Sequence, residues 1–453
     1  MRLKITGGRI YDPASGWQGE VRDLLIEGDR VVSRLTAADR IIDAKRKMVV
    51  AGGIDLGAQV ATYGATFLYL LNGGPTLREL GLAYAFLGYT HVHEPFLTPV
   101  TAALVHRRLA ALPIVDVSAS LVLNLRDLDA WLKDRDRWGE IAETIRFLLE
   151  KTRSLDVRLV EPFVRYRQEF YAHRNIYPDE ALDILTRLAL DHRLKFIVQA
   201  SPDVVNASYL EPRAFHLAGL SQALQNGGAG AAALRHLDAG VTADCGLYLP
   251  RPDPGPQIKV DLGWYQPLNL NPAIFRQQAR DALDLALSYQ GHNLAFSAMA
   301  PTPVREYPEL FTWLLDRTLR QKTWGKETAE REYSLSDWTR ATRTLPAQIL
   351  GLTDRGHLQP GARADVAIYD LSEGKKPRLS PASLRRVHTL IKGGEIVIDN
   401  FQLVKPDAAK ATYFRRTEAQ ATALVADICQ YRSFRPESLW VPDELGGPWV
   451  GMD

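Results

Sequence analysis

The middle of the chain alternates short β-rich runs with helical stretches, and this alternation constrains the fold more than any other feature. Runs such as "GYTHVHEPF" and "DVRLVEPF" are separated by periodic segments such as "IAETIRFLLEKTRSL" and "PDEALDILTRLALDHR". Strands that alternate with helices of this length predict parallel β/α units. The stretch 53–345 suits a closed (β/α)8 barrel, so we expect an α/β protein with a TIM-like barrel. An open doubly wound sheet is the alternative, but its usual GxGxxG turn is missing.

The two ends of the chain are strand-rich and share one residue pattern. Gly and Asp punctuate apolar alternation in 1–52, and the same pattern returns in 346–411. We therefore expect a single small β-sandwich built from both ends, with the barrel over 53–345 between them. The last segment, 412–453, carries aromatic and arginine side chains with little periodicity. Such a tail is expected to pack on the sandwich or on a partner protein of a complex.

Composition excludes several classes of protein. The chain has 55 Lys and Arg against 53 Asp and Glu, so its net charge of +2 is too small for a nucleic-acid footprint. The only two cysteines, Cys245 and Cys429, rule out a zinc ribbon and a disulfide framework. The N-terminus lacks the apolar core of a signal peptide, and no run of about 18 apolar residues occurs. We expect a cytoplasmic protein without a membrane segment.

The stretch "MVVAGGIDLGAQVA" at 48–61 begins like the first strand of a metallohydrolase and then departs from that pattern. Together with "GLTDRGHLQPGARADVAIYDL" near the other end, it resembles the amidohydrolase superfamily. The stretches "AYAFLGYTHVHEPFLTPV" and "REYPELFTWLL" are more narrowly similar to the A-type subunits of formylmethanofuran dehydrogenase and of the related formyltransferase/hydrolase complex. The resemblance runs from the start of the chain to about residue 445.

The resemblance implies a barrel that holds two metal ions and hydrolyses a formyl amide to formate and an amine carrier. It implies two histidines at alternate positions of one strand, which share a face and bind the same metal. It further implies a carboxylated lysine between the ions, more histidines, and an aspartate that takes a proton from the metal-bound hydroxide.

The residues at the corresponding positions of this chain cannot supply that site. Arg158 stands at the lysine position, and a guanidinium stays protonated and does not become a carbamate. The other ligand positions hold Gly57, Gln59, Gln199 and Gly219, and Ala298 stands in place of the catalytic aspartate. We therefore expect no metal and no other cofactor, and we infer that the Arg158 cation fills part of the space and charge that the ions occupied.

Other residues remain candidates for chemistry. His91 and His93 lie two apart on a predicted strand, so they share a face and form an alternative zinc pair, with His216 and Asp244 as further ligands. Asp244 and Cys245 end a strand, where barrel active sites lie, although a buried, inert thiol is the simpler interpretation of Cys245. Arg158, Arg305 and Tyr307 are candidate substrate-binding residues.

Three interpretations of function follow. The first is an A-type component of a one-carbon formyl complex that acts as a scaffold or docks a methanofuran-like carrier, with the other subunits as partners. The second is an active metal-dependent formyl-amide hydrolase with relocated ligands. The third is a metal-independent amidohydrolase relative that acts on another small substrate. The loss of ligands at separate motifs favours the first.

Overall fold

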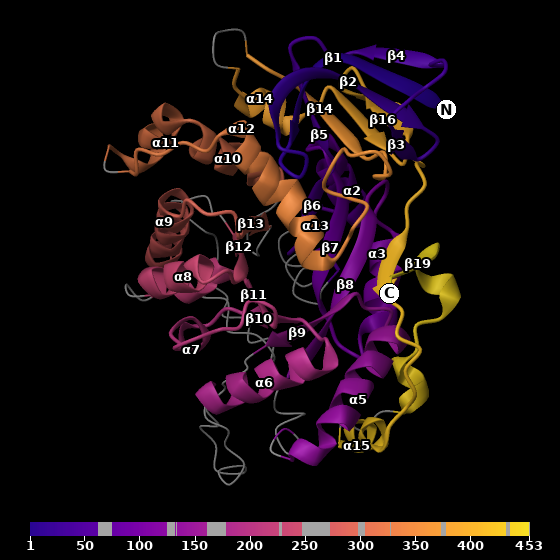
Figure 1. Cartoon of the computed structure of the whole chain (residues 1–453), viewed down its shortest axis with the longest axis vertical. Helices are drawn as coiled ribbons and strands as arrows, with labels where there is room; N and C mark the ends of the chain where they lie inside the picture. The colour runs from indigo at the N-terminus through magenta and orange to yellow at the C-terminus, as the bar shows by residue number, and fades with distance from the viewer. Residues whose placement is uncertain are drawn as a thin grey trace.

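The computed structural model shows a barrel with a smaller sheet above it and a C-terminal segment along one side (Figure 1). The residues that the structure describes are 1–61, 75–124, 132, 134–160, 178–225, 229–246, 272–297, 304–326, 328–372, 377–431 and 435–452.

The larger sheet contains the barrel. Eight strands pair in parallel with their neighbours in chain order, from β6 to β13. No pairing joins β13 to β6 among the described residues, and the helical segment 340–350 contacts both. The predicted α/β class with a TIM-like barrel is confirmed. The strands are β6 (Gly53–Asp55), β7 (Tyr89–Leu97), β8 (Asp116–Asn124), β9 (Asp156–Val160), β10 (Phe196–Gln199), β11 (Phe215–Ala218), β12 (Thr242–Gly246) and β13 (Leu294–Ser297).

Helices between the strands cover the outside of the barrel. In α5, Ile141, Ile145 and Leu148 recur at helical spacing and are buried, which fixes the face that packs on the strands. None of the helices in the described part of the chain combines the length and apolarity that crossing a bilayer requires. In the described residues, the helices of eight or more residues are α2 (Leu77–Phe86), α3 (Ala102–Ala110), α5 (Trp138–Lys151), α6 (Pro178–His192), α8 (Ala229–Asp238), α9 (Pro272–Ser288), α10 (Tyr307–Leu315), α11 (Arg317–Trp324) and α15 (Ala423–Tyr431).

The smaller sheet is built from both ends of the chain. Its order is β17-β16-β15-β14-β5-β1-β2-β3, with β4 paired to β1, so β14 from late in the sequence lies against β5 from its start. Figure 1 shows these indigo and orange strands side by side. The strands are β1 (Arg2–Asp12), β2 (Trp17–Glu27), β3 (Arg30–Val32), β4 (Arg40–Asp43), β5 (Lys47–Ala51), β14 (Val366–Asp370), β15 (Thr389–Lys392), β16 (Glu395–Asp399) and β17 (Gln402–Leu403).

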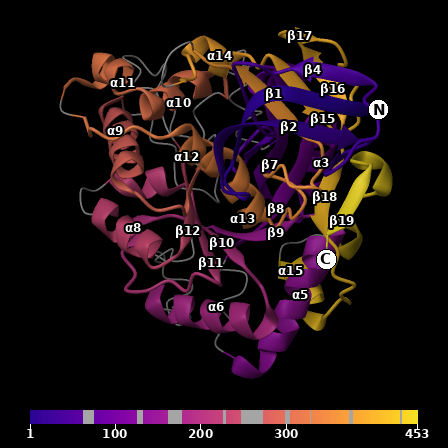
Figure 2. The same ribbon diagram turned by 45° about the horizontal axis from the view of Figure 1, so that its top comes forward.

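The C-terminal segment lies on the barrel. Strand β18 (Thr412–Arg415) pairs with the start of β8, and β19 (Trp449–Met452) pairs with β18. This is possible because β9 pairs with β8 only from Ser120 onward, which leaves the first part of β8 open to another strand. Helix α15 contacts α5, and Figure 2 shows the yellow segment beside that helix. The expectation named the sandwich or a partner protein as the surface for this segment, and in the described residues β18 pairs with the barrel strand β8.

A buried network of charges lies where the barrel, the smaller sheet and the C-terminal segment meet. Asp116 at the start of β8 accepts from Lys392 Nζ at 2.7 Å and from Arg355 Nη2 at 2.5 Å. It also accepts from the backbone N–H of Ala411 at 2.7 Å, and Arg355 Nη1 donates to Asp365 at 2.8 Å. Because these side chains are at most 5% exposed, their mutual pairing replaces the water they have lost.

Candidate functional site

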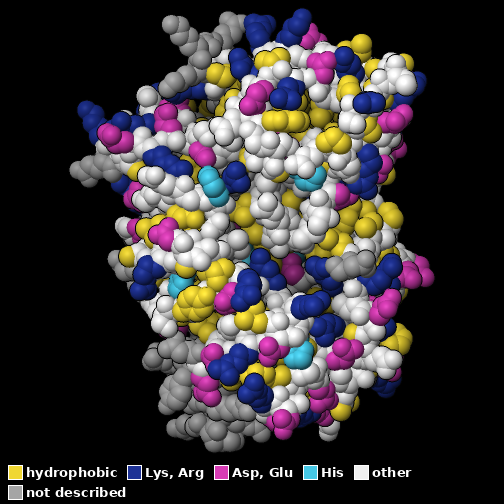
Figure 3. Space-filling model, viewed as in Figure 1, with side chains coloured by type: hydrophobic (Ala, Val, Ile, Leu, Met, Phe, Trp, Pro, Cys, Tyr) yellow, Lys and Arg dark blue, Asp and Glu magenta, His cyan; other side chains and the backbone are white. Residues whose placement is uncertain are grey.

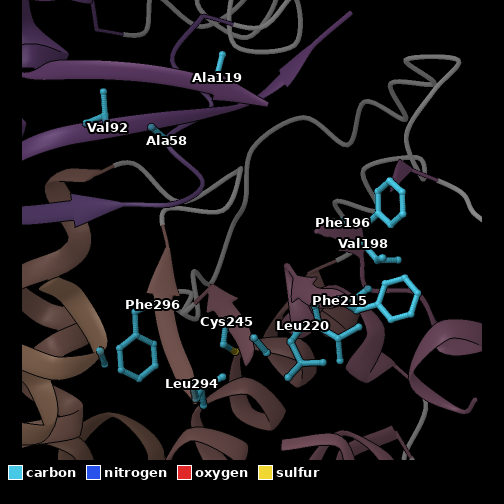
Figure 4. Packing of buried hydrophobic residues seen from close by; sticks show 14 of the residues in the cluster. Ala58, Val92, Ala119, Phe196, Val198, Phe215, Leu220, Cys245, Leu294 and Phe296 are labelled. Carbon is cyan, nitrogen blue, oxygen red and sulfur yellow. The ribbon is translucent and has the colours of Figure 1, made fainter. Parts of the chain in front are cut away.

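The barrel strands carry polar side chains on one face and apolar side chains on the other. Val92, Val117 and Ala119 belong to the hydrophobic cluster that includes buried residues of the surrounding helices, and Figure 4 shows Val92 and Ala119 together. Because side chains alternate along a strand, the positions between them point into the barrel. The barrel interior is therefore the candidate site.

Histidine and serine side chains form a continuous hydrogen-bonded chain in this interior. Ser118 Oγ lies 2.8 Å from His91 Nε2 and 2.8 Å from His93 Nδ1. The other ring nitrogen of His93 lies 2.7 Å from Ser120 Oγ. The structure thus brings the two histidines of the predicted zinc pair together, with serine hydroxyls on three of their four ring nitrogens.

Electrostatics keep these histidines neutral. Burial lowers the pKa of His91 well below its ordinary value, and the nearby Arg355 cation lowers it further. Burial also lowers the pKa of His93, although the carboxylate of Asp156, 3.5 Å from His93 Nε2, acts in the opposite direction. Neutral, hydrogen-bonded imidazoles line the interior without adding positive charge to it.

Arg158 on β9 forms the second feature of the interior. Its side chain is 1% exposed, and its Nε and Nη2 both donate to Gln199 Oε1, at 3.2 and 2.6 Å. Gln199 in turn donates to Gln222 Oε1 at 2.7 Å, and the Arg158 guanidinium lies 4.9 Å from the ring centroid of Phe96. The predicted cation therefore lies in the interior, held between β7 and β10.

His216 on β11 and Asp244 on β12 form a third group. His216 Nε2 lies 3.0 Å from Asp244 Oδ2, and Ser297 on β13 donates to Asp244 Oδ1. Burial raises the pKa of Asp244, but hydrogen bonding to His216 and the charge of Arg158 outweigh it and leave that pKa below its usual value. Asp244 is thus a buried carboxylate that depends on its neighbours to stay ionised.

Asp55, at the end of β6, connects the first barrel strand to neighbouring elements through hydrogen bonds. Asp55 Oδ2 accepts from the hydroxyls of Tyr84 and Tyr307, both at 2.8 Å, and Oδ1 accepts from the backbone N–H of Gly57 at 3.0 Å. Tyr307, a predicted substrate-binding residue, is 2% exposed and its hydroxyl is occupied by this bond. Its position indicates that it holds β6, the first strand of the barrel, and α10 together.

We expect Tyr307→Phe to lower the free energy of unfolding by about 1–2 kcal/mol, because it removes one buried hydrogen bond to a carboxylate. Urea denaturation of the purified chain measures this loss. Tyr209→Phe is the matched control, since Tyr209 is 58% exposed and its hydroxyl also donates to a carboxylate, at 3.0 Å to Glu211. A loss no larger than that of the control would contradict the structural role of Tyr307.

Cys245 and Arg305 lie apart from the polar groups. Cys245 is buried among Leu294, Phe296 and the other apolar side chains that face the helices (Figure 4), and burial raises the pKa of its thiol. This environment is that of an inert buried thiol. Arg305 is 60% exposed and lies 3.9 Å from Glu79. The geometry therefore gives neither residue a partner in the interior cluster.

The positions where the resemblance implies metal ligands do not supply a ligand set. Gly57 and Gly219 have no side chain to offer, and their backbone N–H groups donate to Asp55 and Asp244. Gln59 holds a positive φ of 44°, and Ala298 lies outside the described residues. Within the described part of the chain, no group of three His, Cys, Asp or Glu is arranged to hold a metal ion. A dinuclear centre does not fit these residues.

Comparisons with known proteins agree with this architecture. Residues 286–398 match the model of the Amidohydrolase family. The chain is 26% identical to the A-type Fhc subunit of the formyltransferase/hydrolase complex of Methylorubrum extorquens, over 89% of each chain. It is 23% identical to protein FwdA of Methanocaldococcus jannaschii, covering 99% of this chain and 98% of the relative.

Solved structures match over the same extent. The X-ray structure of the formyltransferase/hydrolase complex (FhcABCD) from Methylorubrum extorquens in complex with methylofuran contains a chain that matches with a TM-score of 0.84 and 23% identity, covering 100% of this chain and 99% of that one. A D-hydantoinase structure matches with a TM-score of 0.55 at 14% identity, over 91% of this chain and 98% of that one.

The chain shares the fold of its counterpart in the formyltransferase/hydrolase complex structure, and residues 286–398 match the Amidohydrolase family model. It is homologous to the A-type Fhc subunit and to FwdA along most of its length.

Proposed function

We propose that this chain is an A-type component of a formyl-transferring or formyl-hydrolysing complex, and that it acts as a scaffold which docks the other subunits and a methanofuran-type carrier. Full-length similarity to two relatives of this kind supports the assignment to such a complex. The observation that carries the non-catalytic role is Arg158, which stands at the lysine position and is buried against Gln199. A permanently protonated side chain at that point repels divalent cations.

In this proposal the interior residues stabilise the barrel and do not catalyse a reaction. Arg158 supplies positive charge near Asp244, and the histidine–serine chain satisfies most of its own polar atoms. The barrel is then stable without ions, and its outer surface remains available to other subunits. On the face shown in Figure 3, lysine and arginine side chains alternate with aspartate and glutamate, which suits a protein surface as partner rather than a polyanion.

Metal analysis tests the non-catalytic role directly. We expect less than about 0.1 divalent ion per chain in protein purified without added metal, and no formate release from formyl amides. Mass spectrometry of the acid-digested protein measures the metal content, and a sample loaded with zinc and then desalted serves as the comparison. About one or two retained ions per chain, lost in His91→Ala/His93→Ala, would instead support the hydrolase with relocated ligands.

Co-purification tests the assignment to a complex. A tagged chain expressed in its own cells should bring down other subunits in fixed ratio, and a strain lacking it should lose the formyl-transferring assembly. The wild-type gene should restore the assembly. An intact and active assembly in the absence of this chain would contradict the scaffold role.

A further inference from the structure

The outward face of α3 is aliphatic and basic. Leu104, Arg107 and Ala111 recur at helical spacing and are exposed, and Val100 lies in the turn before the helix. Val100 is 59% exposed and Leu104 is 42% exposed. The opposite face of α3 is buried on the barrel through Ala102, Val105, His106 and Leu109. The side of α3 that meets water therefore carries aliphatic side chains with arginine beside them.

The two arginines of α3, Arg107 and Arg108, have no carboxylate partner in the part of the chain that the structure describes. The helix contains no acidic residue, and none occurs in residues 95–115. Nε of Arg108 is also buried without a hydrogen-bond acceptor. On α5 and α6, by contrast, arginines pair with carboxylates of their own helix, Arg146 with Glu143 at 3.6 Å and Arg187 with Asp183 at 2.8 Å.

The electrostatics of the helix end do not require these arginines. Cations are favourable beside the carbonyl groups at the C-terminal end of a helix. Lys410 already occupies that place, since its Nζ donates to Ala110 O at 2.5 Å. The segment η7 (Asp443–Leu445) contacts α3, but its Asp443 carboxylate pairs with Arg153 at 2.6 Å. The positive charge on the outward face of α3 is therefore not balanced by an ion pair within the described residues.

We propose that the α3 face, formed by Val100, Leu104, Arg107, Arg108 and Ala111, docks an acidic segment of another subunit. Carboxylates of that segment pair with the two arginines, and its apolar side chains cover the aliphatic residues. Arginine is enriched at the centre of protein interfaces, whereas aspartate, glutamate and lysine are depleted there. A symmetric contact between two α3 faces supplies no carboxylate, so the occupant is a different chain. Its assignment to the same complex rests on the proposed function.

Site-specific photo-cross-linking in the cells that make this chain tests the α3 face. A benzophenone amino acid in place of Leu104 should cross-link to another subunit of the purified assembly, at a peptide rich in aspartate and glutamate, which mass spectrometry identifies. The same label in place of Leu190 on α6 is the matched control, because Leu190 is 38% exposed. An intact assembly in which position 104 cross-links to nothing, or only to a second copy of this chain, would overturn the proposal.

Charge reversal measures the contribution of the arginines. Arg107→Glu in the tagged chain should lower the recovery of other subunits at least about 10-fold, because carboxylates then face carboxylates. Arg235→Glu is the matched control, since Arg235 is exposed in the last turn of another barrel helix, α8, and should leave recovery unchanged. Equal recovery with the two variants would show that the charge of the α3 face is not recognised and would refute the docking.

An aliphatic variant separates this inference from the proposed function. Leu104→Asp should lower the recovery of other subunits, whereas Leu190→Asp should not. All four substituted positions are exposed, so urea denaturation should show wild-type stability for each variant. If the wild-type chain recovers no other subunit, the proposed function and the α3 docking both fail. If the wild-type chain assembles and the Leu104 and Arg107 variants assemble equally well, the α3 docking alone is refuted.

Discussion

Asp116→Asn should lower the free energy of unfolding by about 3–5 kcal/mol, the largest loss we expect from a single side chain. The substitution removes the negative charge that Lys392 and Arg355 share and leaves both cations buried and incompletely paired. It also weakens the bond from the Ala411 backbone that begins the C-terminal segment. Urea denaturation monitored by circular dichroism measures the loss.

A surface ion pair provides the control for Asp116. Asp399 accepts from Arg40 at 2.6 Å, but the two side chains are 31% and 46% exposed. Asp399→Asn should therefore change the free energy of unfolding by less than about 1 kcal/mol. If the two asparagine variants were equally stable, the buried network would not be what joins the barrel, the smaller sheet and the C-terminal segment.

The same carboxylate makes stability depend on pH. Burial raises the pKa of Asp116, but Arg355 and Lys392 outweigh it and hold that pKa below its ordinary value. A carboxyl group whose pKa is lower in the folded state contributes stability that is present above its unfolded pKa of about 3.9 and is lost as pH falls below it. The difference between wild type and Asp116→Asn should therefore shrink in acid, and the same denaturation series at several pH values measures it.

The fold was predictable because local patterns determine it. Alternating strands and helices gave parallel β/α units, and the repeated strand texture at both ends gave one composite sheet. The position of the C-terminal segment was not predictable, because it depends on an unpaired stretch of β8 that only the register of β9 reveals. The pattern of apolar and polar residues does not show which backbone positions of a strand remain without a neighbouring strand.

The candidate site was predictable only in part. Alternation in "THVHE" placed His91 and His93 together, and the same alternation in "DVSAS" places Ser118 and Ser120 on one face, although their role was missed. The position of Arg158 followed from the resemblance, but its contact with Phe96 and the bond from its partner Gln199 to Gln222 join distant parts of the chain. Tyr307 was expected near a ligand because it follows the last strand. Its bond to Asp55 joins residues 252 positions apart, a contact that no local pattern signals.

Arg158→Met should lower the free energy of unfolding by about 3 kcal/mol, because it removes the charge at a position buried against Gln199 and Phe96. Arg305→Met is the control, since Arg305 is 60% exposed and its loss should cost less than about 0.5 kcal/mol. The double variant Arg158→Met/Asp244→Asn should regain about 1 kcal/mol of the summed single losses, because the charge of Arg158 acts on Asp244.

The pH dependence of this variant separates charge from packing. Asp244 has a lowered pKa in the folded chain, so the stability it contributes is present at neutral pH and disappears as pH falls below about 3.9. Without Arg158 this contribution is smaller, and the cost of Arg158→Met should therefore decline in acid. A loss of equal size at every pH, with no coupling to Asp244, would mean that the arginine only fills volume. In that case Arg158 would not be the cation that stabilises the buried carboxylate of Asp244.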